Sequence, residues 1–230
     1  MFTPKFIKNL FFDKGRLRAL GRSFDPTRVF AKQGDLDGSC AIYSLMMMLI
    51  FHQKLDWEDL VDGERAKENE FVDRIQRQFL YDFKGLCFGG HIMDELSGNL
   101  NLCFGEKLTE VFTTMPRKYN SVSRRELHLK IRAQLDARKP VMLGFWGAKG
   151  NGHAVVAIGY QKLRNQLLLF CLDPGRPLPF VQIWNNVIGL DYLSCNDDAL
   201  TDINHYAEEE VCVANIMIIN ENTPELDCPF

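Results

Sequence analysis

The region after position 140 constrains the fold of this chain more than any other part of the sequence. It contains short runs rich in β-branched and aromatic residues, separated by turn-forming residues, which is the pattern of β-strands. The runs are VMLGFWG, HAVVAIGY, LLLFCLD, FVQIW and VCVANIMIIN. Because helical patterns precede these runs rather than alternate with them, we expect an α+β fold with an antiparallel sheet over residues 141–220.

The middle region, residues 55–139, predicts helices. In its first half Phe71, Ile75, Phe79 and Phe83 recur every four residues, which places them on one helical stripe that ends near Gly85.

A second helix is predicted in the same region by its start signal. Ser123 stands three residues before Glu126, the spacing of a capping box. Leu127, Ile131 and Leu135 then form an apolar face, and the proline at 140 ends the pattern.

The N-terminal arm, residues 1–30, is basic near its start. Its apolar residues Phe2, Phe6, Leu10 and Leu17 fit one face of a helix. Such an arm either binds a membrane surface or a partner, or packs its apolar side on its own domain. No boundary separates the three regions, so we expect a single domain over residues 1–230.

Bulk composition excludes several classes of function. A net charge of −3 and the lack of a basic-aromatic strip argue against nucleic acid as a partner. No apolar run is long enough for a membrane span, and lysines interrupt the start of the chain, so we expect no secretory signal. The protein is therefore expected to be cytoplasmic, or exported by a non-Sec route. Cys87 and His91 lack a second ligand pair, so we expect neither a metal nor a cofactor.

Cys40 lies where a glycine-rich loop, QGDLDGSC, meets the apolar segment AIYSLMMMLIF. A helix beginning at this point would offer free backbone N–H groups to the sulfur, which favours the reactive thiolate. Position alone leaves a buried structural thiol equally open. We expect the nearby Asp35 and Asp37 to face solvent or to brace the loop.

His153 and Asp173 are the candidate partners of this thiol. His153 begins one predicted strand, and Asp173 ends the next, before a Pro-Gly turn. If the two strands form a hairpin, both residues lie at its open end, close enough for the carboxylate to accept the imidazole N–H. A nucleophilic cysteine needs such a base and such an orienting group. Gln33, seven residues before Cys40, is the candidate side-chain donor of an oxyanion hole beside the Cys40 backbone N–H.

The motifs QGDLDGSC, GHAVVAIGY and CLDPG together resemble the papain-like cysteine peptidases. They are most similar to the small bacterial branch that includes the leader-cleaving peptidase domains of bacteriocin exporters and related effector domains. The resemblance covers under a third of the chain. It implies a central helix that carries Cys40 and packs on the sheet, with Cys40 as nucleophile, His153 as base and acid, Asp173 as orienting group and Gln33 in the oxyanion hole.

Three functions follow from this set of residues. The first is a thiol hydrolase that cleaves a peptide or isopeptide bond in a protein or peptide substrate. The second is a glutamine deamidase or acyl transferase that uses the same triad, because a fold does not determine the reaction. The third is a non-catalytic binding module on the same scaffold.

Overall fold

A computed structural model describes residues 3–33, 39–62, 69–77, 93–104, 108–115, 120–147, 152–163, 166–180, 182–191, 202–204 and 209–220. The helices are α1 (Cys40–Phe51), α2 (Trp57–Val61), α4 (Glu70–Ile75), α5 (Met93–Phe104) and α6 (Arg124–Asp136). The N-terminal strands are β1 (Lys5–Phe6), β2 (Leu10–Asp13), β3 (Arg16–Leu20) and β4 (Pro26–Arg28). The later strands are β5 (Thr109–Thr113), β6 (Val141–Gly147), β7 (Gly152–Leu163), β8 (Gln166–Leu172), β9 (Asn186–Asp191), β10 (Asp202–Asn204) and β11 (Glu209–Ile219).

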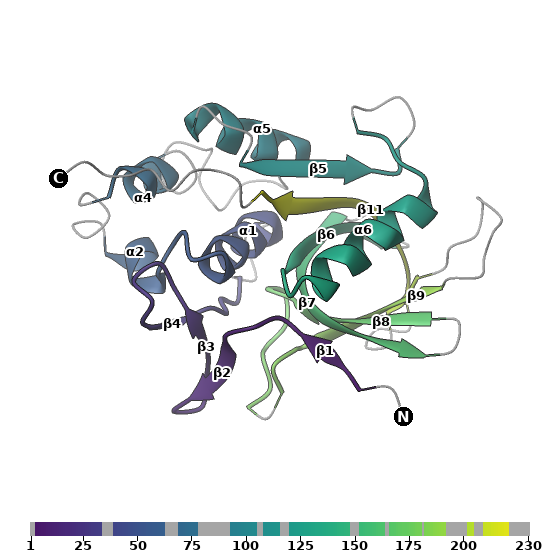
Figure 1. The fold of residues 1–230 in the computed structure, drawn as a ribbon, viewed down its shortest axis with the longest axis horizontal. Coiled ribbons are helices and arrows are strands. Elements are labelled where there is room, and N and C mark those ends of the chain that lie inside the picture. The colour runs from purple at the N-terminus through teal and green to yellow at the C-terminus, as the bar shows by residue number, and fades with distance from the viewer. Residues whose placement is uncertain are drawn as a thin grey trace.

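Six of the later strands, β6 to β11, form a closed ring in which every pairing is antiparallel (Figure 1). The order around the ring is β7, β6, β11, β10, β9 and β8, and β8 pairs with β7 again. The fold is therefore α+β with an antiparallel sheet, as the strand-like runs predict. The closure of the sheet was not predicted.

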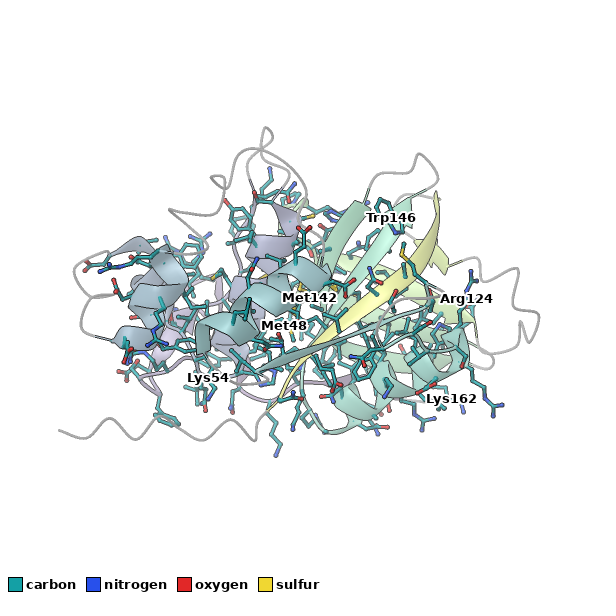
Figure 2. The ribbon with its side chains drawn as sticks, turned by 90° about the horizontal axis from the view of Figure 1, so that it is seen from above. Met48, Lys54, Arg124, Met142, Trp146 and Lys162 are labelled. Carbon is teal, nitrogen blue, oxygen red and sulfur yellow. The ribbon has the colours of Figure 1, made fainter. Side chains whose placement is uncertain are left out.

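Alternating side chains divide the core into two clusters, because successive residues of a strand point to opposite faces. The α6 cluster joins Leu143 and Val155 to the apolar face of α6. The α1 cluster joins Met142 and Val156 to α1. Figure 2 shows Met142 and Met48, a buried residue of α1, near the centre of the molecule. The sheet is thus covered by α1 on one face and packs with α6 on the other.

The middle region was expected to be helical, but part of it forms a strand. Strand β5 lies within it and pairs with β11, outside the ring. Thr109, Val111 and Thr113 are buried and alternate with more exposed residues, which is the period of a strand and not of a helix. Helix α4 contains Phe71 and Ile75, both packed in the α1 cluster. The remaining predicted members of that stripe, Phe79, Phe83 and Gly85, lie outside the described residues.

The N-terminal arm is a correction to the sequence analysis, because it forms strands and no helix among its described residues. Strands β2, β3 and β4 make a separate antiparallel sheet, and β1 pairs with β7. Leu17 and Ala19 of β3 are buried in the α1 cluster. Their period of two favours a strand, and Lys14 with Gly15 at positive φ supplies the turn that precedes it. The arm packs on its own protein, which was one of the two expectations.

Of two local predictions, the cap of α6 and the strand FVQIW, only the first agrees with the structure. The cap of α6 is confirmed, since the Ser123 side chain accepts a hydrogen bond from the Glu126 N–H. The expected strand FVQIW is wrong: residues 182–184 form no strand, and β9 begins at Asn186. Trp184 instead packs its ring against Phe170, at a centroid distance of 4.8 Å. None of the described helices is long and apolar enough to cross a membrane.

Candidate functional site

His153 and Asp173 meet at the open end of the β7–β8 hairpin, as the sequence predicts. The two strands pair from Leu163 and Gln166 at the tight turn back toward Leu172, with one irregularity after Ala157. His153 Nε2 lies 2.7 Å from Asp173 Oδ1, a hydrogen bond between a partly exposed imidazole and a carboxylate that is 2% exposed. His153 lies on β7 and Asp173 directly follows β8, so the pairing of these two strands positions both residues.

The Asp173 carboxylate has further partners, so it is held in one orientation. Oδ1 also accepts a hydrogen bond from the Gly175 N–H at 2.8 Å. Oδ2 accepts from Asn186 Nδ2 at 3.0 Å and lies 3.4 Å from Arg176 Nε. A buried carboxylate requires such compensation, because an unpaired buried charge is very costly. His153 thus binds a carboxylate whose two oxygens both have further partners.

Asn185 fixes the backbone that carries Asp173. Its Oδ1 accepts the Asp173 N–H at 2.6 Å, and its Nδ2 donates to the carbonyl oxygens of Asp173 and Arg176 at 2.8 and 2.9 Å. Sequence reasoning missed both Asn185 and its neighbour Asn186. The signal available was a pair of amides between apolar runs, in the segment IWNNVIGL, which is where a buried polar support can stand.

Cys40 is the first residue of α1, as predicted, and its side chain is buried, with 9% exposed. Ser39 is the N-cap residue, but its hydroxyl makes no capping hydrogen bond, and the first turn has no acidic residue. The Ser39 hydroxyl therefore does not compete with the Cys40 sulfur for the free backbone N–H groups at this helix end.

Helix α1 is tied to β7 close to the candidate site. One turn after Cys40, the Ser44 hydroxyl donates a hydrogen bond of 3.1 Å to the carbonyl oxygen of Ala154. Ala154 follows His153 directly in the chain. The bond therefore fixes the start of α1 relative to the start of β7, and so the sulfur relative to the imidazole.

The His153 ring hydrogen-bonds both the Asp173 carboxylate and the Cys40 sulfur. Because Nε2 is the atom bound to Asp173, Nδ1 is the ring nitrogen left for the sulfur. Burial of the ring opposes its protonation, but the hydrogen bonds and charges of Asp173 and Cys40 outweigh this effect and raise the pKa of His153 to about 10. The ring therefore holds its proton more strongly than an ordinary imidazole does.

The second free thiol in the described core behaves differently. Cys171 is fully buried in β8, and its thiol donates a weak hydrogen bond of 3.8 Å to the Leu169 carbonyl oxygen. Burial, and then the charge of Asp173, raise the pKa of the Cys171 thiol well above its usual range. Cys171 therefore has the environment of an inert structural cysteine, in contrast to Cys40.

Gln33 lies beside the turn that carries Asp173. Its backbone N–H donates to the Pro174 carbonyl oxygen at 2.9 Å. Its Oε1 atom is buried, and among the described residues it accepts no hydrogen bond. The structure therefore brings Gln33 to the site, next to the hairpin that carries His153. Asp35 and Asp37 lie outside the described residues.

One aromatic ring and a glycine border the imidazole. Phe145, the cross-strand partner of His153, packs edge-on against it with ring centroids 5.4 Å apart. Trp146, near the end of β6, is labelled in Figure 2 and is 44% exposed. A Cβ atom on Gly175 would stand 3.3 Å from His153 Cε1, so the small residue lets the turn approach the ring closely.

Comparison with known proteins gives no family: no family model and no curated protein matches this chain. The site must therefore be interpreted from its own chemistry. Within the described part of the chain, no group of three or more His, Cys, Asp or Glu side chains is arranged to hold a metal ion. Cys87 and His91 lie outside the described residues.

Proposed function

We propose that this protein is a cysteine hydrolase with a papain-like arrangement, which cleaves a peptide or isopeptide amide bond in a protein or peptide substrate. The observation that supports this most strongly is one ring with two partners: His153 hydrogen-bonds Asp173 through Nε2 and also bonds the Cys40 sulfur. A nucleophile, a base and an orienting group in this sequence of contacts are the requirements of nucleophilic acyl transfer.

The reaction proceeds in two stages. The Cys40 thiolate attacks the amide carbonyl carbon, and the imidazolium of His153 gives its proton to the leaving nitrogen as the carbon–nitrogen bond breaks. A thioester with Cys40 and a free amine result. Water then attacks the thioester and transfers a proton to His153, which releases the carboxylic acid and restores the thiolate–imidazolium pair. Asp173 keeps the ring oriented throughout.

Two donors are available for the oxyanion that forms in each stage. One is the Cys40 backbone N–H at the start of α1, a helix end without a side-chain cap. The other is the side-chain amide of Gln33, a residue whose backbone N–H donates to the Pro174 carbonyl oxygen beside the hairpin. Preorganised donors of this kind stabilise the transition state by about 3 to 4 kcal/mol each.

The first test measures the reactivity of single cysteines by mass spectrometry. Folded protein is treated with iodoacetamide at neutral pH, and the labelling rate of each cysteine-containing peptide is followed. We expect Cys40 to react fastest and Cys171, the internal reference, to stay unlabelled. Replacing His153 by Gln, which keeps a similar side-chain volume, should slow the labelling of Cys40 and leave Cys171 unchanged. Equal rates for the two thiols would contradict the proposal.

The second test identifies the bond attacked. Wild-type protein and the Cys40→Ala variant are each incubated with a lysate, and proteins retained by the variant are then offered to the wild-type enzyme. Two fragments indicate cleavage, whereas a mass gain of about 1 Da indicates that ammonia was released from a glutamine by the same chemistry. Unmodified binding partners, together with an unreactive Cys40, would instead show a binding module and refute the hydrolase.

A further inference from the structure

The segment between β8 and β9 has no regular secondary structure among its described residues. Strand β8 ends at Leu172, and β9 begins at Asn186. Within the described part of 177–184, the backbone makes one weak local hydrogen bond, from the Gln182 N–H to the Pro179 carbonyl oxygen at 3.5 Å. The position of this segment therefore depends on how its side chains pack.

Trp184 is the apolar side chain of this segment that stands next to the support of the candidate site. It directly precedes Asn185, whose amide bonds both the N–H and the carbonyl oxygen of Asp173. The indole packs against Phe170 of β8 and adjoins the α1 cluster. Because neighbouring Cα atoms are held at a fixed distance, a displacement of Trp184 would move Asn185 with it.

An aromatic residue from the start of the chain covers this indole. Phe6 of β1 stacks on Trp184, with ring centroids 5.5 Å apart and an angle of 17° between the rings. It also packs against Phe170 at 5.2 Å, so the three rings contact one another. Aromatic pairs at such distances attract each other beyond the effect of apolar burial. Rings from β1 and β8 thus hold the indole together.

Strand β7 is shaped to receive the Phe6 ring. Figure 1 shows β1 beside β7, where Phe6 pairs with Gly159. A Cβ atom on this glycine would stand 2.5 Å from the Phe6 ring. The irregularity in the pairing of β7 with β8 falls between Ala157 and Gly159. A glycine inside a strand weakens it and often marks a close approach, which here is the approach of Phe6.

Hydrogen bonds fix β1 in this place. The Arg138 guanidinium donates to the Phe6 carbonyl oxygen at 2.6 Å. The Ile7 N–H donates to the Ile158 carbonyl oxygen at 2.9 Å. These bonds set the register of β1 on β7, so that the Phe6 ring meets Trp184 in one defined position.

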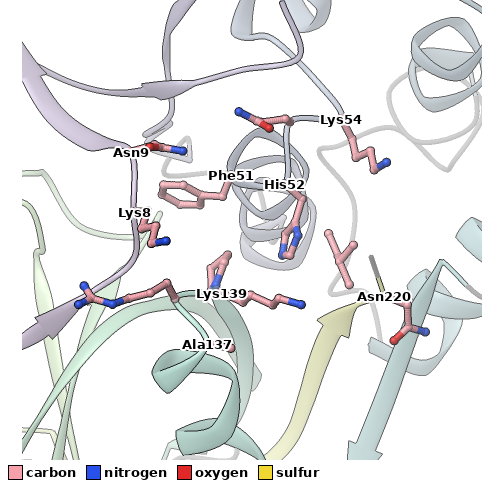
Figure 3. Close-up of a pocket in the computed structure, with 12 residues that line it drawn as sticks. Lys8, Asn9, Phe51, His52, Lys54, Ala137, Lys139 and Asn220 are labelled. Atoms are coloured by element: carbon pink, nitrogen blue, oxygen red, sulfur yellow. The ribbon is translucent and has the colours of Figure 1, made fainter. Parts of the chain in front are cut away.

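The next residues of the arm contact a different part of the molecule. Lys8 and Asn9 line a cavity at the end of α1 (Figure 3). Helix α1 begins at Cys40 and has 12 residues, so this end lies about 17 Å from Cys40 along the helix axis. Phe6 is therefore the residue through which this part of the arm contacts Trp184.

We propose that Phe6 is a positioning residue of the candidate active site: it holds Trp184 and, through Asn185, the Asp173 carboxylate that orients His153. This inference rests on the proposed function, because it assigns Phe6 a role in the reactivity of the thiol. An event that displaces β1 from β7 therefore weakens the site without a change in any of its reacting groups.

The test is Phe6→Ala in the full-length protein, studied well below its melting temperature. We expect iodoacetamide to label Cys40 about three- to tenfold more slowly than in the wild type, since a poorly oriented imidazole stabilises the thiolate less. In a Cys40→Ala background, the same change should lower the pKa of His153, measured by imidazole nitrogen NMR, because its bond to Asp173 weakens. A merely structural role would lower the melting temperature and move neither quantity.

The matched control is Leu100→Ala, which truncates a fully buried side chain of α5, a helix that packs on β5 and β11. It should lower stability and leave the labelling rate of Cys40 unchanged. If Phe6→Ala fails to fold by circular dichroism, Phe6→Leu keeps an apolar side chain, loses the flat ring and should show a smaller change in the same direction.

The proposal is overturned if the Phe6 variant keeps both the wild-type labelling rate and the pKa of His153, or if the control slows labelling equally. A wild-type Cys40 that reacts no faster than Cys171 would contradict the proposed function instead. In that case the NMR comparison still decides whether Phe6 positions the Asp173–His153 pair.

Discussion

The protonation of His153 gives the most direct test of the site. The perturbation is Asp173→Asn, made in a Cys40→Ala background so that the sulfur does not contribute. Asn keeps the size of the side chain and an oxygen that can accept from Nε2. The Asn186 amide can turn to present its own oxygen, which lacks a partner among the described residues, to the new amide group.

The expected effect follows from the balance of forces on the ring. A pKa of about 10 against an ordinary value of 6.5 corresponds to about 5 kcal/mol, shared between Asp173 and Cys40. With Cys40 removed, Asp173 alone should still keep the pKa of His153 above 6.5. With Asp173 also neutral, burial is left unopposed, and the pKa of His153 should fall below 6.5.

The raised pKa of His153 also determines how the free energy of unfolding depends on pH. Because folding raises the pKa of His153, the interaction stabilises the protein fully below pH 6.5, and this contribution is lost as pH rises from 6.5 toward the folded pKa. The Cys40→Ala protein should therefore lose less than about 5 kcal/mol of unfolding free energy across this range, the part that Asp173 contributes, and Cys40→Ala/Asp173→Asn should show no such loss.

Imidazole nitrogen NMR gives the pKa of His153 in each variant, and urea unfolding at the two ends of the pH range gives the stability. A single pKa common to both variants would refute the argument, because it would mean that Asp173 does not hold the proton on the ring. A loss of stability toward low pH, in place of high pH, would refute the assigned sign.

Three further changes test how the site is supported. Ser44→Ala should cost about 1 kcal/mol in urea unfolding and slow the labelling of Cys40 by iodoacetamide, because its bond to the Ala154 carbonyl sets the thiol relative to the imidazole; an unchanged labelling rate would contradict this. Gly159→Ala should cost about 2 kcal/mol or more, since the new Cβ would stand 2.4 Å from the Lys5 carbonyl oxygen and force β1 away; native stability would disprove the close approach. Ser123→Ala should cost about 1 kcal/mol through the lost cap, and Ser123→Asp should restore it, both measured by thermal unfolding.

The candidate site was more predictable than its supports. Residue types at turns and strand ends placed His153 and Asp173 together, because a hairpin with a short turn allows little choice of register. The start of α1 at Cys40 followed from a change of composition. By contrast, the roles of Asn185 and Asn186 could not be predicted from the sequence. These residues lie 12 and 13 positions after Asp173, and only the path of the folded chain brings them into contact with it.

The sequence predicted the fold class but not how the strands pair with one another. Runs of β-branched residues indicated the strands but could not show that β8 pairs back with β7 to close the ring. Short segments also misled: β5 and β3 are five residues each, too few for period two to stand out against a helical background. In both cases tertiary pairing, and not local preference, decided the structure.

The two core clusters bear on how this protein responds to denaturing conditions. Cys40 belongs to the α1 cluster, whereas Phe145, against which His153 packs, belongs to the α6 cluster. The thiol and the ring against which the base packs therefore belong to different core clusters, while His153 and Asp173 lie on one hairpin. A partial opening that separates α1 from the sheet would disconnect the sulfur and leave the imidazole–carboxylate pair intact. Thiol reactivity thus becomes a probe of subglobal opening, lost at lower denaturant than the secondary structure of the strand ring.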